Sequence, residues 1–154
     1  MANEVGEDDN STDVQVADIV GNQDWFLTHI IENIINQGVE IGVTLTISGQ
    51  VVSGMLIGGK TYFKELGQLI AGASKKEGDI YDTLGEDWPK NAALYEKPED
   101  ASDDWVEPLA SYLHLREAYY LNPGQSVFPV KPGMLWRGRI SRVDGFSIGN
   151  ISVD

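Results

Sequence analysis

The sequence predicts an α+β domain in which five short antiparallel strands follow one helix and enclose a second. Three observations predict it. An apolar run at helical spacing covers residues 25–35, five short segments of strand-forming residues come after it, and turn residues separate most of these segments. Because short strands joined by turns pair with their neighbours, we expect one antiparallel sheet.

The first helix and the first two strands have the clearest patterns. Asn22 is a favoured N-cap residue and Asp24 lies in the first turn, so the helix is predicted to begin there. Residues 39–47 alternate strictly, with an apolar residue at every odd position, which is typical of a half-buried strand. Ser48-Gly49 then forms a turn, and residues 50–57 form the returning strand.

A helix and an acidic insertion are predicted next. Gly58-Gly59 ends the second strand, and apolar residues at helical spacing predict a helix that ends near Gly78. Residues 79–108 are acidic and contain proline, with scattered aromatic residues. This segment is long for a loop in a compact domain, so we expect a mobile insertion, with room for a short helix.

The last three strands complete the predicted sheet. Residues 112–121 form the third strand, a Pro- and Gly-containing loop follows at 122–133, and residues 134–143 form the fourth. Asp144-Gly145 is typical of a type I′ hairpin turn, which needs positive φ at both positions. Residues 146–153 are then the fifth strand.

Together these elements predict a single domain over residues 22–154. Its order of a helix and five short strands favours either a strongly curved five-stranded sheet or a small barrel of the SH3 or Sm type, and it leaves both open. Residues 1–21 are acidic and polar, so we predict a disordered N-terminus.

The charge of the chain is distributed unevenly. The formal net charge is −13, yet residues 1–24 hold seven acids and no base, and residues 77–107 hold eleven acids and two lysines. The rest of the chain is therefore slightly basic. The acidic segments either keep the protein soluble or screen the basic part and tune self-association. A chain with this much negative charge is not expected to bind nucleic acid, because the phosphates of nucleic acid repel it.

The composition also limits the class of protein. The chain has no cysteine, which excludes disulfides and thiolate metal sites. No apolar run approaches the ~20 residues of a membrane helix, and the N-terminus lacks the pattern of a secretory signal. We therefore expect a cytoplasmic protein that does not enter a membrane.

One segment matches a nucleotide-binding motif. Residues 54–61, from Gly54 to Thr61, fit the P-loop pattern G-x-x-x-x-G-K-[ST] between a strand and a helix. Three of the intervening residues are Met, Leu and Ile, which are typical of a strand end. A P-loop enzyme is thus an alternative that we do not favour. His29 and His114 lack partners at metal-binding spacing, so no metal, no cofactor and no enzyme activity are expected.

The segment from Trp136 to Phe146 is the predicted partner-binding site. Strand alternation places Arg137 and Arg139 side by side on one face. Arg and Trp are the residue types that most often anchor protein interfaces. In the structural alternative the tryptophan lies in the core and the arginines pair with acids on neighbouring strands. The predicted binding residues are Trp136, Arg137, Arg139, Arg142 and Phe146.

This segment also carries a resemblance to a known family. The residues Trp136-Arg137-Gly138-Arg139-Ile140, followed by Val143-Asp144-Gly145-Phe146, resemble the C-terminal signature of the gas vesicle accessory protein U (GvpU) family. Upstream, Leu45-Thr46-Ile47-Ser48-Gly49 and His114-Leu115 fall in a similar order. The resemblance covers residues 24–75 and 112–153. The acidic N-terminus and the Trp-containing acidic insertion depart from the family pattern.

The resemblance implies a cytoplasmic, non-catalytic accessory protein of gas vesicles, the gas-filled protein shells that give cells buoyancy. It implies a role in assembling or clustering these shells, with the shell or other gas vesicle proteins as partners and with self-association into a homo-oligomer. The alternative from another class is a small-barrel oligomer that binds nucleic acid or protein through Arg137, Arg139 and Arg142.

Overall fold

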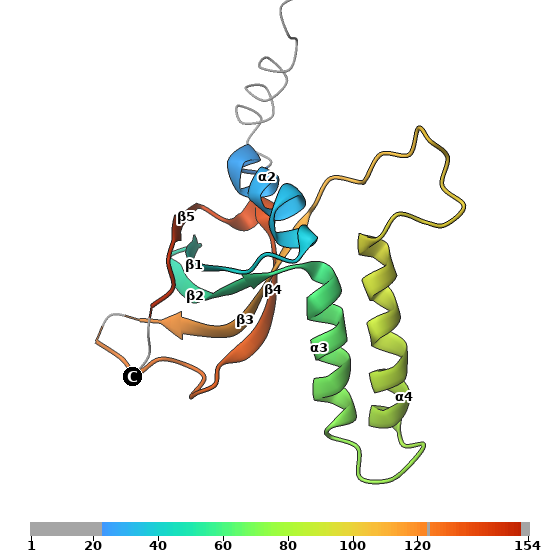
Figure 1. Cartoon of the computed structure of the whole chain (residues 1–154). Coiled ribbons are helices and arrows are strands. Elements are labelled where there is room, and N and C mark those ends of the chain that lie inside the picture. The colour runs from blue at the N-terminus through green and yellow to red at the C-terminus, as the bar shows by residue number, and fades with distance from the viewer. Residues whose placement is uncertain (1–22, 123, 152–154) are drawn as a thin grey trace, which may run out of the picture.

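The computed structural model describes residues 23–122 and 124–151, and it contains one five-stranded antiparallel sheet with helices packed on it (Figure 1). The α+β class and the five antiparallel strands are therefore confirmed. The strand order is β4-β3-β2-β1-β5. The strands are β1 (Ile41–Ile47), β2 (Gln50–Ile57), β3 (Tyr112–Leu121), β4 (Met134–Arg139) and β5 (Gly145–Ile148).

Within the described residues the sheet is not closed into a barrel, because β4 and β5 are its two edges. Strong curvature of the sheet stays a prediction. The predicted disordered segment 1–21 and the predicted cap Asn22 lie outside the described residues. The described chain begins its first helix later than predicted, after Asp24, whose carboxylate accepts hydrogen bonds from the Phe26 and Leu27 N–H groups. An acidic N-cap of this kind satisfies donors that the helix leaves free.

Six helical segments accompany the sheet within residues 23–122 and 124–151. No described helix is long and apolar enough to cross a membrane. The segments are α2 (Trp25–Asn33), η1 (Ile35–Gln37), α3 (Gly59–Ala71), α4 (Ile80–Asp87), η2 (Trp88–Tyr95) and η3 (Ile140–Arg142).

The main core lies between α2 and one face of the sheet. Buried apolar residues of α2 and η1 meet the inward-facing residues of the three central strands, and Ile140 of η3 joins them. The helix packs here because its apolar residues recur at helical spacing, while the strands present every second residue to it. The core residues are Leu27, Ile30, Ile31, Ile35, Val43, Leu45, Val52, Leu56, Leu113, Leu115, Ala118 and Ile140.

The predicted β1–β2 hairpin is confirmed, and its turn has the geometry typical of two-residue hairpins. Ser48 and Gly49 have φ values of 51° and 80°, and Ile47 pairs with Gln50 across the turn. Positive φ at both central residues is the type I′ geometry, whose twist matches that of the strands.

The second predicted hairpin, at Asp144-Gly145, is wrong. The fourth strand ends at Arg139 rather than Val143, and η3 carries the chain across, so β4 pairs with β3 while β5 pairs with β1. Gly145 does not have positive φ. Asp144 instead binds the C-terminal end of β1 and the turn that follows it: its backbone N–H donates to the Thr46 carbonyl, and its carboxylate accepts the Ser48 N–H at 2.7 Å.

Because of these contacts, Asp144 should contribute more to stability than Gly145, whereas a hairpin turn would have made Gly145 the critical residue. An Asp144→Ala variant should lower the free energy of unfolding by about 1 kcal/mol, because the Ser48 N–H loses its acceptor. A Cβ on Gly145 would meet nothing within 4 Å, so Gly145→Ala should cost under ~0.5 kcal/mol. Urea unfolding of both variants measures this. A larger loss for Gly145→Ala would mean that the residue forms a turn after all.

Residues 80–95, in the segment for which we expected mobility, form α4 and η2 beside α3 (Figure 1). The helices lie close because glycines stand where they meet. A Cβ on Gly67 of α3 would lie 2.1 Å from Pro89, and one on Gly85 would lie 2.7 Å from Ala71. Residues 96–111 contain no helix or strand. Mobility of this insertion stays a prediction.

Candidate interaction surface

Trp136 is a supporting residue of the core rather than a free anchor. Its ring is half-buried and packs against the core between α2 and the sheet, and its indole Nε1 donates to the Tyr120 hydroxyl at 3.0 Å. The ring also covers Gly138, where a Cβ would lie 2.2 Å from the Trp136 Cη2 atom. The glycine in the Trp-Arg-Gly-Arg sequence therefore makes room for the tryptophan.

Arg137 points to the other face of the sheet and is held there. Its guanidinium lies 3.9 Å from the centroid of the Tyr112 ring and 5.5 Å from that of Phe63. Its Nη1 atom donates to Nε2 of His114 at 2.6 Å. A cation stacked on aromatic faces and hydrogen-bonded to a buried ring has a fixed position.

His114 lies at the centre of a small aromatic cluster beneath α3. It is 2% exposed, and the rings of Tyr62, Phe63 and Tyr95 surround it at centroid distances of 4.4, 6.1 and 6.0 Å. Burial, and then the charge of Arg137, lowers the pKa of His114 to about 3. The ring is neutral near pH 7, with Nε2 as acceptor and the proton on Nδ1.

The sequence analysis missed this cluster. His114 lies on β3 between the buried Leu113 and Leu115, and no local pattern shows that α3 and η2 return to cover it. The only available signal was a histidine inside an apolar strand, which is not specific.

Arg139 and Arg142 are exposed, and they are close in sequence at the end of β4 and in η3. The ion pairs of the described chain involve Lys60, Lys90 and Arg116, and none of them uses either of these two arginines. Arg137 is likewise exposed and without an ion pair in this part of the chain, but its guanidinium contacts Tyr112 and His114. Among the described residues Arg139 and Arg142 have no such contact, so they are the predicted binding arginines that are most available to a partner.

Phe146 belongs to a different surface. It lies on β5, at the opposite edge of the sheet from β4, and its ring is 6.0 Å from that of Phe26 on α2. Phe26 is in turn 5.7 Å from Trp25, and both side chains of α2 are exposed. Trp136 and Phe146 are both half-buried against the core, at opposite edges of the sheet, and Phe146 also borders the exposed aromatic side chains of α2. Arg137 contacts Tyr112 and His114, and Arg139 and Arg142 have no such contact among the described residues.

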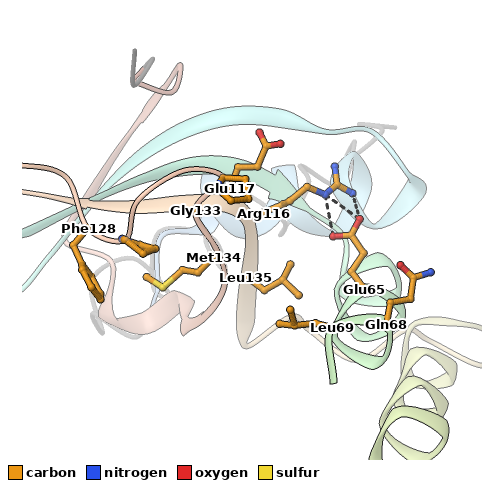
Figure 2. Close-up of a pocket in the computed structure, with 11 residues that line it drawn as sticks. Glu65, Gln68, Leu69, Arg116, Glu117, Phe128, Gly133, Met134 and Leu135 are labelled. Atoms are coloured by element: carbon orange, nitrogen blue, oxygen red, sulfur yellow. Dashed lines mark hydrogen bonds and ion pairs between the residues drawn. The ribbon is translucent and has the colours of Figure 1, made fainter. Parts of the chain in front are cut away.

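An open groove of about 810 Å³ lies between α3 and the start of β4 (Figure 2). Leu69, Phe128 and Leu135 contribute apolar lining, and Arg116 contributes the positive charge. That charge is already neutralised: Arg116 Nε lies 2.9 Å from both carboxylate oxygens of Glu65, and its Nη1 lies 2.8 Å from Glu40. These hydrogen bonds raise the pKa of Arg116 further above its ordinary range.

The P-loop match does not form a phosphate cradle. Residues 54–57 belong to β2, which pairs with β1 on one side and with β3 on the other. Gly58 is the extended N-cap residue of α3, and Lys60 forms an ion pair with Glu96. A cradle needs free, converging N–H groups, and a strand inside a sheet does not offer them.

Comparison with known proteins gives one match. The family model described as "Gas vesicle protein GvpU-like" matches residues 24–151, which is most of the chain and includes the whole sheet. No curated protein and no solved structure matches.

Proposed function

The chain belongs to the GvpU-like family of gas vesicle proteins, and from this premise we propose that it is a non-catalytic, cytoplasmic accessory protein that assembles or clusters gas vesicles. It acts through protein–protein contacts with the shell or another gas vesicle protein, and through self-association.

The observation that carries this proposal is the pair of free arginines. Arg139 and Arg142 are exposed cations without an ion-pair partner among the described residues, in a chain whose net charge is −13. Exposed arginines recognise carboxylates through several directed N–H donors. The matching acids belong to a gas vesicle protein or to the acidic segment 77–107 of another copy. Arg137 supports the surface by fixing β4 and does not need to touch the partner.

We predict that an Arg139→Glu, Arg142→Glu double variant loses gas vesicle binding while its fold is retained. Both side chains are exposed, so the change should cost under ~0.5 kcal/mol of stability per site. Like charges across the interface should weaken binding at least ~10-fold. Co-sedimentation with purified gas vesicles measures binding, and circular dichroism reports the fold.

Lys75→Glu, Lys76→Glu is the matched control, since it makes the same charge change at exposed residues beyond α3. If both double variants lose binding equally, only net charge matters and the arginine surface is not the site. Raised salt should also weaken the wild-type contact, because exposed charges are screened beyond ~8–10 Å. Binding that is unaffected by salt would contradict a contact made by these arginines.

A further inference from the structure

The outer edge of β5 is short, but it lacks the charges and prolines that protect many sheet edges. In the described part of the chain β5 pairs only with β1, and residues 145–151 contain no charged residue and no proline. Edge strands normally carry charges, prolines or bulges that prevent pairing with another chain. The other edge, β4, does carry charges, at Arg137 and Arg139.

The ladder geometry shows which backbone groups of β5 point outward. Ile47 and Gln50 form the hydrogen-bonded pair that closes the two-residue turn, so odd-numbered residues of β1 bond to β2 and even-numbered ones bond to β5. The Gly149 N–H donates to the Gly42 carbonyl at 2.7 Å, which agrees with this pattern.

Since Ser147 pairs with Thr44, its backbone groups face β1. Phe146 and Ile148 therefore direct their N–H and C=O groups to the free edge. The side chains of Phe146 and Ile148 share the face on which Phe146 meets Phe26, and Ile148 is 62% exposed. The free edge thus has an apolar flank.

We propose that two copies of this chain pair through β5 in antiparallel orientation, with Ser147 opposite Ser147 and Phe146 opposite Ile148. This inference rests on the self-association proposed above and names the surface that performs it. In this register the outward groups of Phe146 and Ile148 form the hydrogen-bonded pairs, and the two serines form the close pair between them. An aromatic residue opposite a β-branched one is a favourable cross-strand pair.

The charge distribution selects β5 over the other edge. Pairing of β4 with itself would bring Arg137 and Arg139 of two copies together, and like charges opposite one another destabilise a sheet. Pairing of β4 with β5 would leave these charges against apolar side chains. The uncharged β5 has neither cost when it pairs with itself.

The four-residue β5 makes a small interface, so the dimer should form at high protein concentration and dissociate on dilution. Two copies with a net charge of −13 each repel one another, and salt screens that repulsion. The β5 dimer should therefore strengthen with salt. A contact made by Arg139 and Arg142 should weaken with salt, so the two kinds of association are separable.

Cysteine cross-linking tests the register directly, because the chain has no cysteine of its own. In a close antiparallel pair the Cα atoms lie about 4.5 Å apart, within the ~4.4–6.8 Å that disulfides span. With diamide as oxidant, Ser147→Cys should form a covalent dimer at least ~10-fold faster than Ser141→Cys, an exposed position in η3. Equal rates would overturn the proposal.

A second pair of variants tests the same surface without new thiols. Ile148→Arg places a charge in the pair and should weaken dimerisation at least ~10-fold in sedimentation velocity at high salt. Leu69→Arg is the control, because Leu69 is 61% exposed on α3 and far along the chain from β5. An unchanged dimer in Ile148→Arg would overturn the inference.

The N-terminal segment is the other conceivable occupant of the edge. If residues 1–22 of the same chain cover β5, the wild-type protein stays monomeric at high salt and dimerises only when they are deleted, and the proposal fails. Dimerisation is measured without gas vesicles. If the β5 dimer does not form, the proposal that Arg139 and Arg142 bind gas vesicles is unaffected. If vesicle binding fails, the proposal of the β5 dimer is likewise unaffected.

Discussion

A His114→Gln variant should lose a pH dependence of unfolding that the wild-type protein has. The folded protein holds this ring neutral, because burial and the neighbouring Arg137 lower its pKa to about 3. In the unfolded chain a histidine has a pKa of about 6.5. Between these two pKa values His114 is protonated in the unfolded chain and neutral in the folded protein. Stability from the neutral ring is therefore complete above about pH 6.5 and is lost as the pH falls toward 3.

The expected size is large for one residue. One proton taken up on unfolding changes the free energy of unfolding by about 1.4 kcal/mol per pH unit. Between pH 7 and pH 4.5 the wild type should thus lose about 2.5 kcal/mol that His114→Gln does not lose. The glutamine keeps an acceptor for Arg137 and does not titrate. Urea unfolding at several pH values provides the comparison, and it removes the contribution of the many carboxylates, which both proteins share.

The other histidine provides the control. His29 is exposed on α2, outside the aromatic cluster, so His29→Gln is the control for the loss of a histidine elsewhere in the fold. If His114→Gln and the wild type lost stability in parallel below pH 6.5, His114 would be protonated in the folded state. The hydrogen bond from Arg137 would then have to break, because a protonated imidazole has no acceptor.

The parts of the fold that were predictable from the sequence depend on neighbours along the chain. The alternation in residues 41–47 and the turn at Ser48-Gly49 determine β1, β2 and their pairing, since a two-residue turn leaves one register. Asp144-Gly145 has an equally strong local signal and is no hairpin. At Asp144-Gly145 a long-range contact determines the structure instead. Ile140 is fully buried in the core, and the chain bends at η3 to place it there.

The same distinction applies to the candidate site. Strand alternation correctly separates Trp136 from Arg137 on opposite faces of β4. Strand alternation does not show that Arg137 contacts His114 and Tyr112 on another strand. It also does not show that Phe146 lies at the far edge of the sheet. The sequence indicates residue types that are common in protein interfaces, and only the strand order shows which of these residues lie together.

The close approach of α3 and α4 makes Gly67 a position of large effect. The residue is buried on α3, and a Cβ there would lie 2.1 Å from Pro89 and 3.1 Å from the Gly85 carbonyl oxygen. Leucine favours a helix over glycine by about 1 kcal/mol, so α3 itself should survive a Gly67→Leu change. The contact between the helices should be lost, because the closest atoms belong to the rigid ring of Pro89, which cannot give way as a flexible side chain does. We expect residues 80–95 to detach from α3 while the sheet stays folded.

Hydrogen exchange distinguishes this outcome from general unfolding. In Gly67→Leu the amides of residues 80–95 should exchange about 100-fold faster, which corresponds to the loss of about 3 kcal/mol of protection, within the usual range for overpacking. The amides of β1 and β2 should keep wild-type rates. Gln68→Leu adds the same side chain at the next, exposed position and should change neither set. If residues 80–95 already exchange fast in the wild type, the insertion is mobile as the sequence predicts. The glycine contacts are then only transient, and Tyr95 does not shield His114 for most of the time.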